Sequence, residues 1–209
     1  MAASLRAGEA DEVRVGTRRA LAEGATAAEV LKGGLLAGMS VVGEEFGRRE
    51  VFLPDVLLAA RAMRAGMDVL EPLLGPGGAP SAGRVVLGTV KGDIHDIGKN
   101  LVGILLRGAG FQVTDLGTDV PAERFVEAAE EAGASVIGLS ALLTTTMAGM
   151  RDVIGLVRER GLSGRVRVIV GGAPVTEAFA REIGADGFAF DARSAVERVR
   201  ALVAEAGRA

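Results

Sequence analysis

The sequence contains no cysteine, no tryptophan and no tyrosine, and it has a single histidine, His95. Without cysteine the chain cannot form disulfides, ligate an iron–sulfur cluster or use thiolate chemistry, which fits a reducing compartment. Because its only aromatic residues are seven phenylalanines, it largely lacks the side chains on which nucleobases and sugars stack. Any chemistry that needs an imidazole from this chain therefore depends on His95.

An excess of one charge and long apolar runs are also missing. The net charge is −3, from 24 basic and 27 acidic residues mixed along the chain, which gives no basic surface for nucleic acid or an anionic membrane. No uninterrupted apolar stretch approaches the roughly 20 residues that cross a bilayer, and charges stand where a signal peptide needs an apolar run. We therefore expect a cytoplasmic protein that binds neither nucleic acid nor membrane.

The spacing of apolar residues divides the 209 residues into two modules. In residues 1–75 apolar side chains recur every three or four positions, which predicts a small helical bundle. Residues 76–83 are rich in turn formers and predict a linker, and residues 84–209 form the second module. About four helices are expected in the bundle, with breaks at Gly24, Gly33-Gly34, Gly43 and the Phe52-Leu53-Pro54 step, where Pro54 suits a first helical turn.

In the second module, short β-branched runs alternate with amphipathic stretches, which is typical of β-α units around a parallel sheet. The strand candidates are 84–90, 111–116, 135–140, 166–170 and 187–190, and the helix candidates are 99–109, 122–132, 146–160, 176–183 and 192–206. Five such units predict a flavodoxin-like, doubly wound α/β fold with a parallel five-stranded sheet. Ligands of such sheets bind beyond the carboxyl ends of the strands, so the loops there are the candidate site.

The loop after the first predicted strand carries the single histidine. Asp93 lies two residues before His95, close enough in an extended loop for its carboxylate to accept the Nδ1 proton and leave Nε2 free as a ligand or base. Gly92 and Gly98 bracket the pair, which indicates that something approaches the backbone closely. A solvated surface histidine is the alternative interpretation.

Hydroxyl groups and glycines follow the third and fourth predicted strands. Ser140 and Thr144-Thr145-Thr146 can cap a helix, although more hydroxyls are present than capping requires. Gly171-Gly172 follows a buried strand and permits either a turn or close contact with a ligand. Neither a Walker-type loop nor a Gly-x-Gly-x-x-Gly spacing is present, so nucleoside triphosphates and dinucleotides are poorly supported.

Taken in order, these loop residues resemble the signature of cobalamin-binding domains that hold the cofactor base-off with histidine on the cobalt. The matching strings are Asp93-x-His95-x-x-Gly98, Ser140-x-Leu142 and Gly171-Gly172. The segment Met39–Met67, with its Phe52-Leu53-Pro54 step, is also similar to the helical cap of methionine synthase. The resemblance thus covers nearly the whole chain, and it is closest to the stand-alone corrinoid proteins of methylamine, methanol and methyl ether methyltransferase systems.

The resemblance implies a set of cofactor residues. His95 would ligate cobalt from below, Asp93 would hydrogen-bond the histidine, and Ser140 would lie in the same network. The cofactor-binding residues expected by this resemblance are Gly92, Asp93, His95, Asp96, Ile97, Gly98, Ser140, Leu142, Thr144, Gly171, Gly172, Phe188 and Asp191. The cap would cover the corrin through Phe46, Phe52, Leu53 and Met63, although apolar residues at helical spacing also fit bundle packing. The family often has tyrosine where this chain has Phe188 or Phe190.

The resemblance also implies a function, that of a methyl carrier with methylcobalamin as the carrier state. A substrate-specific methyltransferase would load the methyl group, a second would pass it to tetrahydrofolate or a thiol, and a reductive activator would be a further partner. The chain would be non-catalytic alone, because no second group of acid, base and nucleophile appears.

Three other functions fit parts of the sequence. A cobalamin sensor or storage module would bind the cofactor without methyl transfer. A corrinoid mutase small subunit would need an open upper face, which the helical module argues against. A phospho-receiver domain shares the topology but needs a lysine at the end of the fifth strand, and Phe188–Asp191 offers none.

Overall fold

The structure, a computed structural model, describes residues 1–74 and 81–206. The chain divides into two compact units, one formed mainly by described residues up to Ser81 and the other by described residues from Ala82 onward. Residues 76–80 of the predicted linker lie outside the described residues. Within the described ranges, no helix combines the length and apolar character needed to cross a bilayer.

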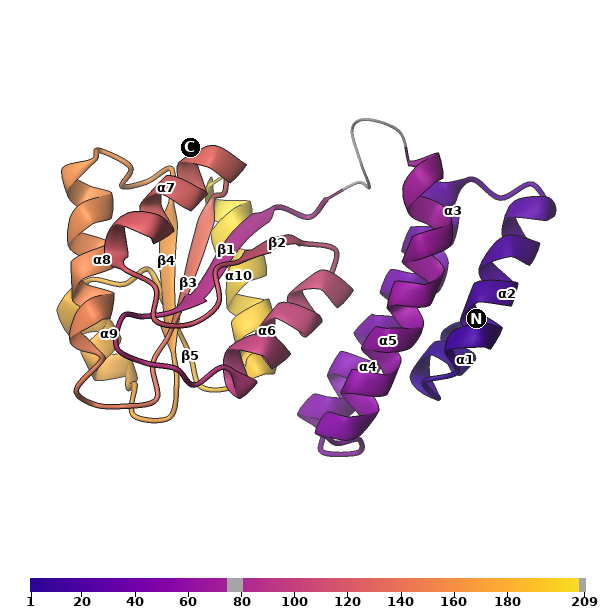
Figure 1. Cartoon of the computed structure of the whole chain (residues 1–209), viewed down its shortest axis with the longest axis horizontal. Helices are drawn as coiled ribbons and strands as arrows, with labels where there is room; N and C mark the ends of the chain where they lie inside the picture. The colour runs from indigo at the N-terminus through magenta and orange to yellow at the C-terminus, as the bar shows by residue number, and fades with distance from the viewer. Residues whose placement is uncertain (75–80, 207–209) are drawn as a thin grey trace. The chain divides into compact units, whose positions relative to one another are not determined.

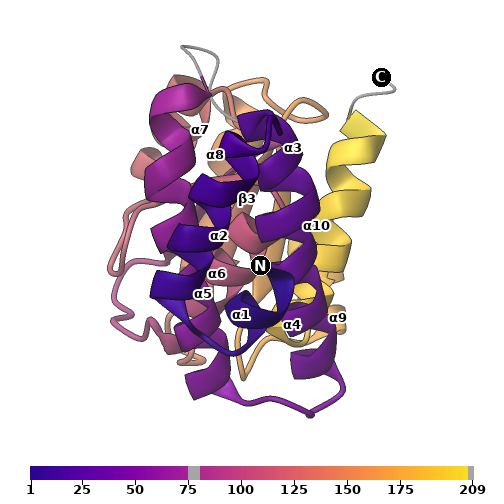
Figure 2. The ribbon, with the colours of Figure 1, turned by 90° about the vertical axis from the view of Figure 1, so that its right-hand side faces the viewer.

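The first unit is a bundle of helices in which α2 (Ala10–Ala22) and α5 (Leu53–Leu70) lie side by side (Figure 2). Its core is formed by aliphatic side chains such as Leu5, Val13 and Leu35, all with no exposed surface. The amide of Phe52 donates to the carboxylate of Asp55 at 2.7 Å, which satisfies a free donor where α5 begins. The elements are α1 (Ala2–Arg6), α2 (Ala10–Ala22), α3 (Ala27–Val30), the π-helical η1 (Leu31–Leu36), α4 (Ala37–Gly47), α5 (Leu53–Leu70) and the 3-10 turn η2 (Glu71–Leu73).

Two of the predicted helix breaks are correct and two are wrong. The chain turns at Gly24, and α5 begins at Leu53 with Pro54 in its first turn. The Gly33-Gly34 pair and Gly43 do not end a helix, because α3, η1 and α4 follow one another without an intervening turn and the pair lies in the π-helical segment. A glycine inside a helix costs only about 1 kcal/mol, which the burial of the neighbouring leucines can offset.

The second unit has the predicted flavodoxin-like fold, with a parallel sheet in the strand order β2-β1-β3-β4-β5 (Figure 1). All five predicted strands and their helices are present. The strands are β1 (Arg84–Thr89), β2 (Gln112–Asp115), β3 (Val136–Ser140), β4 (Arg167–Gly171) and β5 (Gly187–Ala189), and the helices are α6 (Ile97–Gly108), α7 (Ala122–Ala132), α8 (Ala148–Glu159), α9 (Glu177–Ile183) and α10 (Ala192–Ala206).

The two faces of the sheet differ in how they are filled. On one face the strand residues Val86, Ile137 and Val168, which are aligned in register, join a buried cluster with side chains of α7, α8 and α9. The alternation of strand side chains places Leu87 and Ile169 on the opposite face, toward α6 and α10. A cavity remains on this second face, and it leads to the candidate site.

Candidate functional site

The strand order places the loops after β1 and β3 next to each other, at the point where connections leave the sheet in opposite directions. The loop after β1 carries Asp93 and His95. His95 Nδ1 lies 2.7 Å from Asp93 Oδ1, and the His95 amide donates to the same oxygen at 3.1 Å. Asp93 is fully buried, whereas 46% of the His95 side chain is exposed. A carboxylate that accepts the Nδ1 proton leaves Nε2 as the free nitrogen of the imidazole.

The other oxygen of Asp93, Oδ2, is held by the loop after β3. It accepts hydrogen bonds from the amides of Leu142 and Leu143, at 2.8 and 3.2 Å, and from Thr146 Oγ1 at 2.7 Å. Burial alone would raise the pKa of Asp93, but the bonds from Leu142, Thr146 and His95 outweigh it and hold the pKa well below its ordinary value. Asp93 is therefore an ionised anchor at neutral pH.

Further bonds fix the histidine loop against its neighbours. The buried hydroxyl of Thr89 donates to the carbonyl of His95 at 2.9 Å. The amide of Gly92 donates to Asp119 Oδ1 at 2.7 Å, and the amide of Asp119 donates to the carbonyl of Asp93 at 2.9 Å. The histidine loop is thus held by β1, by the loop after β2 and, through Asp93, by the loop after β3.

An ion pair between buried Lys99 and Asp115 fixes the start of α6. The side chain of Lys99 is 2% exposed, and its Nζ donates to both carboxylate oxygens of Asp115, at 2.7 and 2.8 Å, and to Asn100 Oδ1 at 2.7 Å. Asn100 in turn donates to Asp96 Oδ2 at 2.9 Å. These bonds connect α6 with the carboxyl end of β2.

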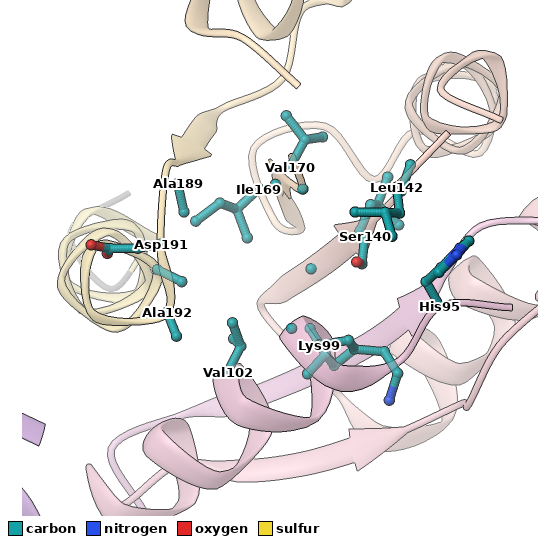
Figure 3. A pocket seen from close by; sticks show the side chains of 18 of the residues that line it. His95, Lys99, Val102, Ser140, Leu142, Ile169, Val170, Ala189, Asp191 and Ala192 are labelled. Carbon is teal, nitrogen blue, oxygen red and sulfur yellow. The ribbon is translucent and has the colours of Figure 1, made fainter. Parts of the chain in front are cut away.

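A pocket of about 600 Å³ adjoins the histidine loop and extends between the sheet, α6 and α10 (Figure 3). Its exposed lining comes from loops and the first turn of α6 and includes His95 and Asp191, whereas its buried lining is almost entirely aliphatic. The predicted site residues that line it are His95, Asp96, Ile97, Gly98, Ser140, Leu142, Gly171, Gly172 and Asp191.

Four predicted cofactor residues do not line this pocket. Asp93 and Gly92 act through the bonds described above, and Thr144 is exposed on the loop after β3. Phe188 packs against the buried cluster on the other face of the sheet, because neighbouring strand residues alternate between faces. Phe190, which is 87% exposed, lines the pocket instead.

Ser140 lies in the pocket wall, and the hydroxyl that bonds Asp93 belongs to Thr146. The sequence offers three consecutive threonines and no signal that selects the third, so only the fold identifies Thr146. The pocket residues of α10, namely Ala192, Ala195 and Val199, have a spacing that predicts a sheet-facing stripe. That spacing does not show that these two alanines line a pocket.

The four predicted cap residues all lie outside the buried core of the helical unit. Phe52 is 66% exposed, and Phe46, Leu53 and Met63 are half-buried. The buried face of α5 is formed by other residues, including Val56, which has no exposed surface. α5 therefore presents apolar side chains on more than one face.

Two family models, each described as a B12 binding domain, match residues 83–200 and residues 1–71. The chain is 51% identical over 177 residues to dimethylamine corrinoid protein 1 of Methanosarcina acetivorans, covering 84% of this chain and 83% of that one. It is 46% identical over 193 residues to a corrinoid protein of Desulfitobacterium hafniense, covering 91% and 89%. A chain of the methanol:cobalamin methyltransferase complex MtaBC from Methanosarcina barkeri has a TM-score of 0.90 at 32% identity, covering 97% of this chain and 78% of that one.

Proposed function

This chain belongs to the family of corrinoid proteins of methylamine and methanol methyltransferase systems, and from this premise we propose that it carries a methyl group on corrinoid cobalt between two methyltransferases. The observation that carries the proposal is the pairing of His95 Nδ1 with the buried Asp93 carboxylate at 2.7 Å. The half-exposed imidazole is left with one free nitrogen at the edge of an apolar pocket, which suits a single axial ligand.

In the proposed arrangement the cofactor would be bound base-off and His-on, and His95 Nε2 would hold its cobalt. The corrinoid supplies the cobalt that accepts and releases the methyl group, and the protein tunes its reactivity. Ionised Asp93 keeps the proton on His95 Nδ1, which fixes the ring orientation and strengthens Nε2 as a donor. Because Thr146 and Leu142 hold the other oxygen of this carboxylate, the tuning group itself is fixed in place.

The surroundings of His95 suit the rest of a corrinoid. Ile94, Ile97, Leu142 and Leu143 are between 42% and 76% exposed, and an apolar macrocycle resting on them would remove that surface from water. We propose that the adjoining pocket of about 600 Å³ would receive the nucleotide tail of a corrinoid held through His95. Its volume falls within the usual range of small-molecule pockets, about 300 to 1,000 Å³.

The helical unit is proposed to cover the upper face of the cofactor through Phe46, Phe52, Leu53 and Met63. The supporting observation is that these apolar side chains are exposed or half-buried, so the bundle core does not use them fully. A cover of this kind would exclude water from the reactive face and would have to move aside for each partner.

The partners proposed are a substrate-specific methyltransferase, a second methyltransferase acting on tetrahydrofolate or a thiol, and a reductive activator. A methyltransferase partner is supported by the MtaBC structure, in which a chain similar to this one belongs to a methanol:cobalamin methyltransferase complex. The dimethylamine corrinoid relatives, at about 51% identity, make a methylamine the first methyl source to try. On this proposal the chain is not catalytic alone.

The test is corrinoid retention followed by methyl transfer. The protein is incubated with hydroxocobalamin and desalted, and its visible spectrum is recorded beside those of His95→Ala and of Glu182→Gln, an exposed control in α9. We expect about one corrinoid per chain for wild type and control, and a changed cobalt spectrum for His95→Ala. The loaded protein should then accept methyl groups from a methylamine-specific methyltransferase. Retention without any transfer would instead support a sensor or storage module, and no retention would contradict corrinoid binding.

A further inference from the structure

We propose that the buried end of the pocket selects corrinoids whose lower base is an aromatic ring without exocyclic polar groups, such as dimethylbenzimidazole, over those with a purine. The inference rests on the proposed function, because it concerns the nucleotide tail of the corrinoid held at His95. It follows from the change in chemical character between the open and buried ends of the pocket wall.

The polar side chains of the pocket wall belong to its open end. His95, Asp96 and Asp191 are exposed residues that line the pocket, and the half-buried Ser140 lines it at the carboxyl end of β3. Asp191 Oδ1 accepts the amide of Ser194 at 2.7 Å and so caps the start of α10, and in Figure 3 its carboxylate points away from the centre of the pocket. These groups can contact a ribose or phosphate near the entrance, but not a base at the buried end.

The floor of the pocket is a row of apolar strand residues. Leu87, Gly138 and Ile169 are aligned in register across β1, β3 and β4, and their backbone groups belong to the hydrogen-bond ladders of the sheet. A Cβ on Gly138 would lie 2.8 Å from Leu87 Cδ1, so a side chain there would displace the leucine. The floor therefore offers van der Waals contact and no free hydrogen-bonding group.

The two helical walls have the same character. Val102 of α6 and Ala195 and Val199 of α10 line the pocket, and the two α10 residues are 5% and 1% exposed. The small side chain of Ala195 leaves room in front of the helix. An aromatic ring between these walls would be surrounded by carbon.

Lys99 is the one charged side chain among the buried, described residues that line the pocket, and its charge is already engaged. Its Nζ donates to both oxygens of Asp115 and to Asn100 Oδ1, all at 2.7 to 2.8 Å. Figure 3 shows the Nζ directed away from the pocket centre. Since an ammonium has three donors, no donor is left for a ligand.

The consequence is a penalty for polar bases. Each base has one ring nitrogen that can bind cobalt and that is left without this partner in a base-off corrinoid. Adenine carries, in addition, an exocyclic amine and further ring nitrogens. Burying such a group without a partner weakens binding by about tenfold or more. The methyl groups of dimethylbenzimidazole gain from burial in the same place.

The test compares three corrinoids on the full chain by equilibrium dialysis: cobalamin, its adenine-containing analogue, and cobinamide, which has no nucleotide. We expect the dissociation constant of cobalamin to be lower than that of the adenine analogue by at least about tenfold. Ala195→Leu, which fills the pocket, should weaken both complete corrinoids and leave cobinamide unchanged. Val199→Thr, which adds a hydroxyl at nearly constant shape, should narrow the difference between the two bases.

Equal affinity of wild type for both complete corrinoids would overturn the inference, even if Ala195→Leu fails to fold. If all three corrinoids bind equally well and neither variant changes this, the pocket does not receive the base, while corrinoid binding at His95 still holds. If none of the three is retained, the proposed function fails together with the inference.

Discussion

Thr146 donates a hydrogen bond to Asp93 across 53 residues of sequence, with 2.7 Å between Thr146 Oγ1 and Asp93 Oδ2. The other oxygen of the same carboxylate lies 2.7 Å from His95 Nδ1. Asp93 therefore transmits the position of the loop after β3 to the imidazole. Thr146 thus helps to orient His95 through Asp93.

This relationship predicts different effects for two hydroxyl substitutions. Thr146→Val keeps the shape of the side chain and removes one of the donors to Asp93, so we expect the free energy of unfolding to fall by about 1 to 2 kcal/mol. Ser140→Ala, the matched control in the pocket wall, should change it by less than about 0.5 kcal/mol. Urea unfolding at pH 7 measures both. Equal losses would mean that Thr146 has no special role as a partner of Asp93.

The lowered pKa of Asp93 predicts a pH-dependent contribution to stability. The unfolded carboxyl titrates near pH 4, at about the ordinary pKa of an aspartate, whereas the folded one stays ionised below that. The contribution is therefore present above pH 4 and is lost as the pH falls toward the folded pKa. We expect Asp93→Asn to lower the free energy of unfolding by about 2 to 3 kcal/mol at pH 7, and by less at pH 3. A difference that stays the same at both pH values would contradict this explanation.

The Asp93 contact also predicts the tautomer of His95. Because the carboxylate is 2.7 Å from Nδ1, the neutral ring should carry its proton there and leave Nε2 unprotonated. His95 is the single histidine of the chain, so a nitrogen-15 NMR spectrum of protein prepared without corrinoid contains one imidazole. We expect shifts of the Nδ1-protonated form in wild type, and a move toward the Nε2-protonated form in Asp93→Asn. Wild type with its proton on Nε2 would contradict the proposed ligand role, because the unprotonated nitrogen would then be Nδ1, which faces Asp93.

The sequence predicted the fold well because each β-α unit carries a local signal. The buried strands are β-branched runs, and α7 and α10 begin and end at the predicted residues. The helical bundle was predicted less well, because glycines that favour a break in the sequence lie inside continuous helix in the structure. In the structure, Gly33-Gly34 lies within the helical run from Ala27 to Gly47, since tertiary packing overrides the modest propensity of glycine.

The site could be predicted only as far as the sequence brings residues together. Asp93 and His95 are near neighbours in one loop, so their pairing was predictable. The choice of Thr146 over Ser140 depends on how the loop after β3 folds back on Asp93. The alternation of β5 side chains between faces likewise separates Phe188 from Phe190, and a strand of three residues is too short for a periodic signal to decide it.

Two glycines of the pocket wall give the last prediction, because they are glycine for different reasons. Gly172 has a φ of +133°, and a Cβ there would overlap the carbonyl oxygen of Ala141, so Gly172→Ala should destabilise the fold itself by more than about 2 kcal/mol. Gly98 lies in the first turn of α6, where a Cβ would meet nothing within 4 Å, so Gly98→Ala should preserve stability or raise it by up to about 1 kcal/mol. If a corrinoid fills the space beside Gly98, the same substitution should weaken cobalamin retention although the protein is fully folded. Thermal unfolding and equilibrium dialysis with hydroxocobalamin separate the two effects, and unchanged retention in Gly98→Ala would place the cofactor away from this glycine.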